Sequence, residues 1–273
     1  MDASTIQQIL IDQKESFDHK SGLIERDIAL APFIETQQVV IISGIRRCGK
    51  SSLLYLIKER MQLRASEYCY FNFDDERIWA ETSLPDLIYQ QHLSIYAKEP
   101  VFFFDEIQNI PKWEKFVNRM YEKGYKFFIT GSNAQLLSSE ISTSLTGRNM
   151  VLHLFPFSFI EYLHLKASST SFTRMTSAQK ALVKHHAHEY LQMGGFPLIL
   201  KENNLDILSD YFRDILYRDI IARYGLSRTE EIRQLAIFLA SNVGKRFSYR
   251  TLQTVSGLKS THSVKDYLDY FRQ

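Results

Sequence analysis

The sequence contains few cysteines: Cys48 and Cys69 are the two among 273 residues. Cys48 stands inside a glycine-bounded loop, where a disulfide would obstruct a ligand. So low a cysteine content, with one thiol in such a loop, is typical of a reducing compartment. We therefore expect a chain that works without disulfides.

Long apolar runs and a large excess of one charge are absent as well. No apolar run approaches the roughly 18 residues of a membrane-spanning helix, and residues 1–20 lack the basic-then-apolar pattern of a signal peptide. Lys and Arg number 33 against 31 Asp and Glu, so the net charge of +2 gives no overall argument for nucleic acid or membrane as a partner. The sequence predicts a cytoplasmic protein without a membrane partner.

Five short runs of β-branched and aromatic residues are present, and most are separated by helical patterns. Several runs are apolar on successive residues, which is typical of strands covered on both faces of a parallel sheet. Alternating strands and helices indicate a doubly wound α/β core. The predicted strands are Gln38 to Ser43, Tyr68 to Phe73, Val101 to Asp105, Lys126 to Thr130 and Met150 to Leu154, and the helices between them are Lys50 to Ala65, Ser83 to Ala97 and Trp113 to Lys123.

Strand patterns nearly vanish after residue 157, and helical patterns follow to the end. We place a boundary near residue 160 and expect an α/β core over residues 1–160, followed by helical parts over 161–229 and 230–273. In the last part, a helix over 248–256, a turn at Gly257 and a second helix over 261–271 are typical of a helix-turn-helix.

A glycine-rich motif for phosphate binding follows the first predicted strand. It matches the pattern G-x-x-x-x-G-K-[ST] and opens a helix, so backbone N–H groups and the helix N-terminus would face an anion. Lys50 would reach the β and γ phosphates of ATP, and the Ser51 hydroxyl would bind Mg²⁺. The predicted nucleotide-binding residues are Gly44, Ile45, Arg46, Arg47, Cys48, Gly49, Lys50, Ser51 and Ser52.

An acidic pair follows the apolar strand that begins at Val101. Asp105 would emerge at the carboxyl end of this strand, where ligands bind in open α/β sheets, and would hold Mg²⁺ through water. Glu106 is placed to take a proton from an attacking water, which favours hydrolysis over transfer to another acceptor. Capping of the next turn is the alternative reading of Glu106.

Two further segments are candidates for catalysis. Thr130, Ser132 and Asn133 end the next strand, and one of them could bond the attacking water or the γ phosphate; we name Asn133 as the candidate. Arg148 precedes the fifth strand and could stabilise charge on the transferring phosphoryl group, in its own chain or in a neighbour's. Ordinary turn chemistry and a surface arginine are the alternatives.

The Cys48 thiol is expected to be reactive. The nearby arginines, Lys50 and the helix N-terminus all favour its thiolate, so we expect a lowered pKa and fast alkylation that bound MgATP prevents. Cys69 lies in an apolar strand and should react slowly. The alternative is that the Cys48 side chain points into the protein and is inert.

With these motifs in order, the chain resembles the AAA+ superfamily, and more closely a prokaryotic family of ATPases in which an AAA-type core precedes a domain of unknown function. The resemblance covers nearly the whole sequence. It is carried by segments 44–51, 70–75, 104–108, 129–133, 145–148, 156–162 and 194–197.

The resemblance implies a strand order and three parts: an ATP-binding core over residues 1–160, a helical lid over 161–229 and a partial winged helix over 230–273. The Thr130 strand would lie between the strand before Gly44 and the strand of Asp105, while Asp74 and Asp75 would lie near the sheet edge, away from the phosphates. The segment 194–197 is similar to a Gly-x-Pro element with which a helical lid closes on adenine, so Pro197 is a candidate contact. Relatives continue past a winged helix into a nuclease-like domain, so the sequence looks truncated after residue 273.

Together these features predict an Mg²⁺-dependent ATPase that acts as a nucleotide-gated switch, with a protein client or a second copy of itself as partner. An ATP-controlled DNA-binding regulator is the alternative, because Lys245, Arg246, Arg250, Lys259 and Lys265 surround the helix-turn-helix. A small-molecule kinase is disfavoured, since nothing suggests an acceptor pocket. His185, His188 and Glu189 share a helix face, which we interpret as solvated rather than metal-binding.

Overall fold

The computed structural model describes residues 2–131, 145–168 and 175–271. Two compact units divide the chain, residues 1–204 and 205–273. Residues 155–204 belong to the first unit, and contacts such as the hydrogen bond from Arg26 Nε to Glu161 Oε1 (2.6 Å) tie them to the preceding part of the chain. The division into three parts stays a prediction.

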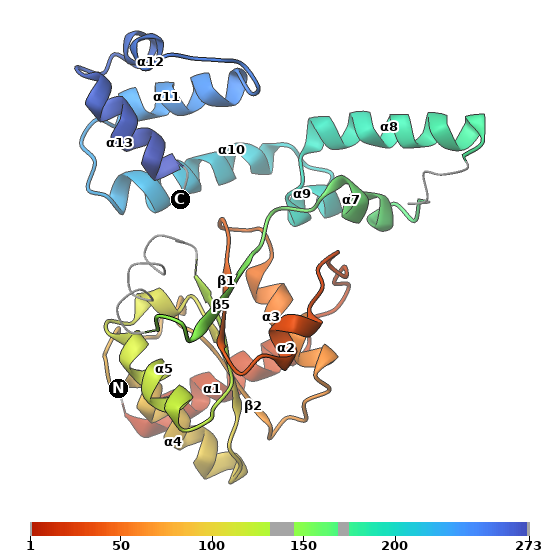
Figure 1. Ribbon diagram of the computed structural model, residues 1–273. Helices are drawn as coiled ribbons and strands as arrows, with labels where there is room; N and C mark the ends of the chain where they lie inside the picture. Colours follow the sequence, from red (N-terminus) through yellow and green to blue (C-terminus); the bar gives the residue numbers. More distant parts are fainter. Residues whose placement is uncertain (1, 132–144, 169–174, 272–273) are drawn as a thin grey trace. The chain divides into compact units, whose positions relative to one another are not determined.

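A five-stranded parallel sheet forms the centre of the first unit (Figure 1). The strand order is β2-β3-β4-β1-β5, so β4 lies between β1 and β3 as the resemblance implied. Each predicted strand is present within about one residue of its expected ends. The strands are β1 (Val39–Ser43), β2 (Tyr68–Asn72), β3 (Val101–Asp105), β4 (Phe127–Gly131) and β5 (Asn149–His153).

Helices cover both faces of this sheet, which explains the uninterrupted apolar runs of the strands. On one face, Val39, Phe102 and Phe127 belong to an apolar core shared with α1 (Ala3–Asp18), α4 (Leu84–Tyr96) and α5 (Trp113–Glu122). On the other face, Val40 and Phe103 pack in a core with α3 (Lys50–Arg60), and α2 (Ala31–Glu35) borders it. Figure 1 shows α3 and α5 on opposite sides of the strands.

The N-terminal helix α1 was not predicted. The Asp2 side chain caps it by accepting a hydrogen bond from Thr5 N (2.8 Å), and Ile6, Ile9 and Leu10 are almost fully buried against the sheet. A short 3-10 turn, η1 (Ile107–Asn109), follows β3. Because α1 packs on the sheet, the segment that follows it, residues 19–30, lies beside the sheet as well.

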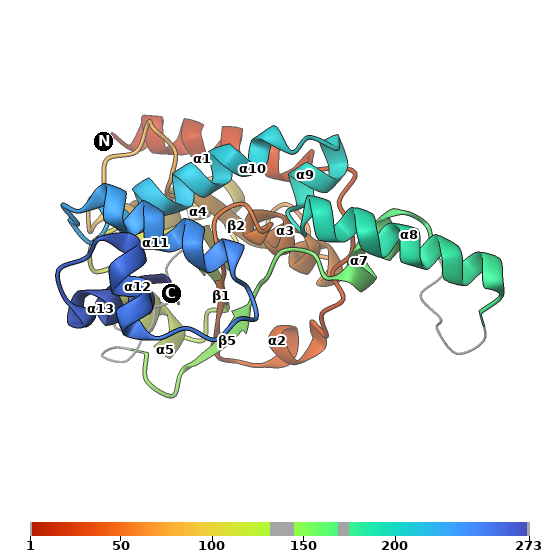
Figure 2. The same ribbon diagram turned by 90° about the horizontal axis from the view of Figure 1, so that it is seen from above.

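Three helices complete the first unit: α7 (Phe159–Leu165), α8 (Ser177–Met193) and α9 (Pro197–Glu202). Helices α7 and α8 lie side by side (Figure 2), and the side chains of Phe159, Tyr162 and Tyr190 pack them together. Ser158 and Glu161 form a capping box at the start of α7. Among the helices of the described ranges, none combines the length and apolarity needed to span a bilayer.

The regular elements among the described residues of the second unit, 205–271, are all helical. Its first helix is α10 (Asp206–Arg213), continued by a π-helical stretch, Asp214–Ala222. The predicted helix pair is present as α12 (Tyr249–Ser256) and α13 (Thr261–Phe271), joined through Gly257 in the left-handed conformation. Leu235 of α11 (Thr229–Ser241) packs with Leu252 and Val264 in the core of this unit.

Candidate functional site

Three strands of the sheet end in the polar segments that the sequence singled out. Ile42 of β1 is paired with Thr130 of β4, and Phe104 of β3 is paired with Ile129. Because these strands are parallel, their carboxyl ends meet at one edge of the sheet. Gly44, Asp105 and Thr130 are therefore brought to the same edge.

The loop from Gly44 to Gly49 requires glycine at both ends. A Cβ atom added to Gly44 would lie 2.2 Å from the carbonyl oxygen of Leu154, so no larger residue fits. Gly49 has a φ of 100°, and Arg47 also adopts a positive φ of 69°. Helix α3 begins directly after Gly49, and no side chain caps it. Its first N–H groups can therefore serve an anion.

Lys50 is folded back into this loop. Its side chain is 4% exposed, and its ammonium donates to the carbonyl oxygens of Gly44 (3.1 Å) and Ile45 (3.3 Å). The same ammonium lies 3.5 Å from Oε1 of Glu106. The loop lysine and the predicted base thus come together.

Asp105 is the most enclosed carboxylate of the site, with 2% of its surface exposed. Burial raises its pKa above the ordinary value, while hydrogen bonds from the side chains of Ser51 and Thr130 act in the opposite direction. The Tyr70 hydroxyl donates to Oδ2 at 3.2 Å. Ser51 and Asp105, the two predicted metal ligands, are therefore adjacent.

Glu106 adopts a left-handed backbone conformation with a φ of 54°. Its N–H donates to Thr130 Oγ1 (2.9 Å), and the Thr130 hydroxyl in turn donates to Asp105. The Gln108 side chain donates to Oε2 of Glu106 at 2.6 Å. Thr130 thus joins both acidic residues. The sequence alone could not rank Thr130, Ser132 and Asn133 as polar groups of the site. Ser132 and Asn133 lie outside the described residues.

The prediction of a reactive Cys48 thiolate is wrong. The side chain is fully buried, packs with the apolar core beneath β1, and would be 3.0 Å from a Cβ atom at Gly44. Burial raises its pKa, although Lys50 and Arg26 act in the opposite direction. The loop turns this side chain inward, so desolvation outweighs the nearby positive charges.

The remaining loop side chains lie nearer the surface than Lys50. Ile45 is 38% exposed, Ser51 and Ser52 are partly buried in the first turn of α3, and the Arg46 guanidinium lies 3.8 Å from Oδ2 of Asp74. Asp74 was expected away from the phosphates. Asp74 follows the edge strand β2, but the long Arg46 side chain reaches from the phosphate loop to its carboxylate.

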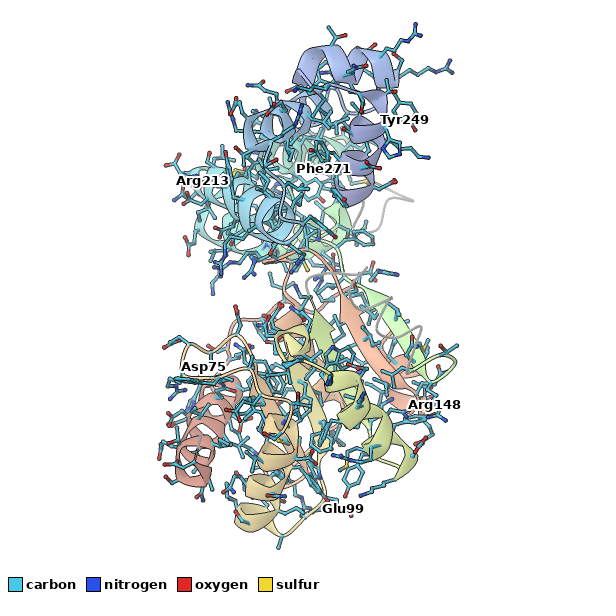
Figure 3. The ribbon with its side chains drawn as sticks, turned by 90° about the vertical axis from the view of Figure 1, so that its left-hand side faces the viewer. Asp75, Glu99, Arg148, Arg213, Tyr249 and Phe271 are labelled. Atoms are coloured by element: carbon cyan, nitrogen blue, oxygen red, sulfur yellow. The ribbon has the colours of Figure 1, made fainter. Side chains whose placement is uncertain are left out.

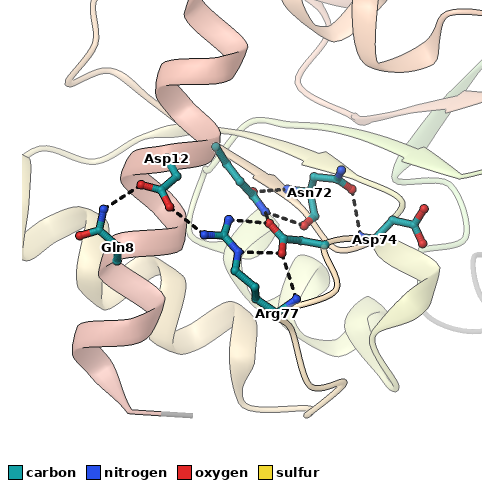
Figure 4. A network of polar contacts seen from close by, with 7 residues as sticks. Gln8, Asp12, Asn72, Asp74 and Arg77 are labelled. Atoms are coloured by element: carbon teal, nitrogen blue, oxygen red, sulfur yellow. Dashed lines mark hydrogen bonds and ion pairs between the residues drawn. The ribbon is translucent and has the colours of Figure 1, made fainter.

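Asp75 belongs to a separate polar network between α1 and the loop after β2 (Figure 4). It accepts from Arg77 Nη2 (2.8 Å) and Gln13 (2.9 Å), and Arg77 also donates to Asp12 (2.7 Å). The Arg77 hydrogen bonds hold the pKa of the Asp75 carboxyl well below its usual range. This network fixes α1 to the sheet.

Arg148 lies at the opposite end of the strands (Figure 3). Its carbonyl oxygen accepts from Val39 N at the start of β1 (2.9 Å), and its guanidinium donates to Asn118 and to Glu122 (2.8 Å) of α5. The loop of Gly44 follows the other end of β1. This position argues against a role of Arg148 in the phosphate site of its own chain.

Pro197 does approach the phosphate loop. A Cβ atom added to Gly49 would lie 3.9 Å from Pro197 Cγ and equally far from Arg26 Nη1. Pro197 is the first residue of α9, after the close contact of Gly195 with the backbone of Phe157. The structure therefore brings Pro197, which is 147 positions after Lys50 in the sequence, beside the loop that precedes Lys50.

Two basic residues of the site were missed. Lys20 donates to the carbonyl oxygen of Ser51 (2.9 Å), and Arg26 donates to that of Cys48 (3.3 Å). Both lie in the segment between α1 and α2, which carries no motif. The sequence did not indicate that Lys20 and Arg26 belong to the site, because neither residue is part of a recognisable binding motif.

Comparisons with known proteins agree with this geometry. Residues 36–163 match the family model of an AAA domain, and residues 184–273 match a domain of unknown function (DUF8612). The uncharacterized protein MJ1544 of Methanocaldococcus jannaschii is 31% identical over 97% of this chain and 60% of its own length. An uncharacterized protein of Haemophilus influenzae is 33% identical over 88% of this chain and 61% of its own. The chain thus spans about three-fifths of the length of these curated relatives.

Solved structures with similar architecture share little sequence with the chain. The RuvB Holliday junction branch migration motor of Thermotoga maritima aligns at a TM-score of 0.37 and 15% identity, covering 99% of this chain and 85% of RuvB. AMPPCP-bound DnaA from Aquifex aeolicus aligns at 0.38 and 13%, covering 89% and 85%. The match of residues 36–163 to the model of an AAA domain and the geometry of the loop together support a P-loop core of AAA type in this part of the chain.

Proposed function

We propose that the chain binds ATP with Mg²⁺ and hydrolyses the γ phosphate. The observation that carries this proposal is the 3.5 Å approach of Lys50 Nζ to Glu106 at the carboxyl edge of the sheet. A phosphate-binding cation and a carboxylate that can accept a proton share one small volume there. Their proximity supports a hydrolytic site.

The donor set next to Lys50 fits Mg²⁺. The Ser51 hydroxyl and the Asp105 carboxylate are adjacent, and hard oxygen ligands are those that Mg²⁺ prefers. When bound, Mg²⁺ neutralises charge on the phosphate oxygens during transfer. Tyr70 and Thr130 hold the Asp105 carboxylate by hydrogen bonds and so fix its orientation.

Lys50 and Glu106 would change partners when ATP binds. The Lys50 ammonium would leave the loop carbonyls for the β and γ phosphates, since a doubly charged oxygen cluster attracts it more strongly. Glu106 would then be free to take a proton from the attacking water. Gln108 and the backbone bond to Thr130 keep the Glu106 carboxylate in place while this occurs.

Two further catalytic residues are part of the proposal. Asn133 would bond the attacking water or the γ phosphate. Arg148 would act in trans, because its place near α5 makes it available to the site of a second copy rather than to its own. Self-association is therefore the partner relationship that this proposal includes.

We further propose that nucleotide binding sets the position of a lid. The approach of Pro197 to Gly49 supports an adenine contact by residues 161–229, with residues 1–160 as the core and 230–273 as the output part. A protein client would read this state. DNA is the second candidate: α12 and α13 carry Arg250, Lys259 and Lys265 nearby, but Asp266 and Asp269 on α13 offset them.

One experiment tests the proposal as a whole. ATP binding and phosphate release are measured for the chain with and without Mg²⁺, and with and without duplex DNA at two salt concentrations. Magnesium-dependent release without any acceptor supports hydrolysis, whereas DNA binding that falls with salt and changes with ATP supports the second candidate. Absence of ATP binding in Mg²⁺ contradicts both.

A further inference from the structure

Arg26 contacts the phosphate loop and is nearly buried. Its side chain is 6% exposed, and it donates to acceptors in three residues. Nε donates to Glu161 Oε1 (2.6 Å), Nη2 to the carbonyl oxygen of Phe155 (2.8 Å), and Nη1 to the carbonyl oxygen of Cys48 (3.3 Å). One guanidinium thus joins the phosphate loop to the segment after β5.

Glu161 holds this guanidinium from the other side. The carboxylate, 4% exposed, also accepts from the N–H groups of Asp27 (3.0 Å) and Ser158 (2.7 Å). Burial acts to raise its pKa, but the bonds from Arg26, Ser158 and Asp27 prevail and lower it. The Arg26 guanidinium also lies 4.8 Å from the ring centroid of Phe157. These contacts leave Arg26 little freedom to move.

The bond to Cys48 matters because of the geometry of the peptide group. In a trans peptide, the carbonyl of Cys48 and the N–H of Gly49 share a plane and point in opposite directions. A donor that fixes the carbonyl therefore also fixes the N–H. Gly49 has no Cβ and a φ of 100°, so its peptide plane would otherwise rotate easily.

We propose that Arg26 is a positioning residue for the phosphate loop: by holding the Cys48 carbonyl, it keeps the Gly49 N–H turned toward the bound phosphates. The inference rests on nucleotide binding at this loop. Arg26 would not touch the phosphates itself. Because Glu161 also caps α7, the same pair couples the loop to the start of residues 159–204.

The test uses Arg26→Met, Glu161→Gln, the double variant and a matched control, Arg60→Met. Arg60 is 66% exposed and pairs loosely with Glu25 (3.9 Å). ATP and ADP affinities are measured by titration, unfolding by heat, and the hydrogen exchange of residues 44–50 without nucleotide. Arg26→Met should weaken ATP binding about 10- to 100-fold and speed exchange in the loop, as expected for loss of a charged hydrogen bond. Arg60→Met should change neither.

The double variant separates positioning from stability. Arg26→Met alone leaves the Glu161 carboxylate buried without its cation, whereas adding Glu161→Gln removes that charge and should restore thermal stability. ATP affinity should stay low in the double variant. Recovery of affinity along with stability, or an Arg26→Met affinity within about twofold of the original, overturns the inference. If Arg26→Met alone does not fold, Arg26→Lys replaces it and should bind ATP more weakly than the unaltered chain, because an ammonium cannot reach all of the acceptors that the guanidinium joins.

Failure of the proposed function would look different. In that case the unaltered chain would not bind ATP in Mg²⁺ at all. The exchange rates of residues 44–50 would still test the positioning role: equal rates in Arg26→Met and the unaltered chain would contradict it.

Discussion

The ammonium of Lys50 lies 3.5 Å from the carboxylate of Glu106 and within hydrogen-bonding distance of two carbonyl oxygens of its own loop. The cation of the phosphate loop is thus held by groups that phosphate oxygens can replace. This arrangement gives the two residues separable roles, one in binding and one in the chemical step.

Replacing Lys50 with Ala should abolish ATP binding or weaken it severely, because the phosphates lose their mobile positive charge. Titration with a fluorescent ATP analogue measures this loss. Lys58→Ala is the matched control, since Lys58 lies on the same helix and pairs with Asp18 (3.0 Å) rather than with the loop. Equal weakening in both variants would show that the effect is structural.

Replacing Glu106 with Gln should preserve ATP binding and slow phosphate release by about 10² to 10⁴, the usual contribution of a positioned base. The substitution keeps the size of the side chain and its ability to bond Gln108. Phosphate release is followed at saturating MgATP, with the affinity determined in parallel. Turnover close to that of the unaltered chain would remove Glu106 from the role of base.

Replacing Arg148 with Ala should leave the ATP affinity of the isolated chain unchanged, because its guanidinium pairs with Glu122 on α5. In a mixture with Lys50→Ala chains, some turnover should return, since each variant keeps the group that the other lacks. Phosphate release across mixing ratios measures the rescue. A strictly monomeric mass in ATP, together with no rescue, would assign Arg148 a structural role.

Cys48 should resist alkylation in the folded protein as strongly as Cys69. Both thiols are fully buried, and burial raises the pKa of each, that of Cys69 to about 12. Mass-mapped labelling in buffer and in denaturant gives the two rates, with Cys69 as the internal reference. If Cys48 is labelled well before Cys69 in buffer and MgATP prevents this labelling, the Cys48 thiolate is exposed and reactive in the folded protein.

His92 should make the first unit less stable in mild acid. Burial, reinforced by the positive charge of Lys14, lowers the pKa of His92 from its ordinary 6.5 to about 4. Between these two pH values the unfolded chain binds the proton and the folded chain does not, so stability rises with pH from about 4 to 6.5. The change is at most about 3 kcal/mol.

Urea unfolding of His92→Leu and the unaltered chain between pH 4 and pH 7 checks this dependence. The Leu variant should lose much of the slope because it carries no titrating group. His185→Gln is the control, since His185 is 67% exposed, and it should keep the full slope. An unchanged slope in His92→Leu would assign the acid sensitivity to other groups.

The strands and the phosphate loop could be predicted from the sequence because their determinants are local. Phe102 to Phe104 are apolar on consecutive residues, and that pattern requires cover on both faces of a sheet. The glycine-rich loop before Lys50 follows such a strand and opens a helix, and a phosphate-binding loop is recognised by this local context. Among the described residues, helices α1, α2 and α9 lacked a pattern that the sequence analysis used.

The tertiary structure decided which residues meet. Arg26 and Glu161 are 135 positions apart and Tyr70 and Asp105 are 35 apart, yet each pair is in hydrogen-bonding contact. Tyr70 and Asp105 meet because β2 pairs with β3, and Arg26 meets Glu161 because the segment between α1 and α2 lies against the start of α7. The direction of the Cys48 side chain was likewise set by the loop conformation, and burial reversed the pKa shift that its charged neighbours predicted. Spacing along a chain records local geometry, whereas desolvation and long-range hydrogen bonds depend on packing between distant segments.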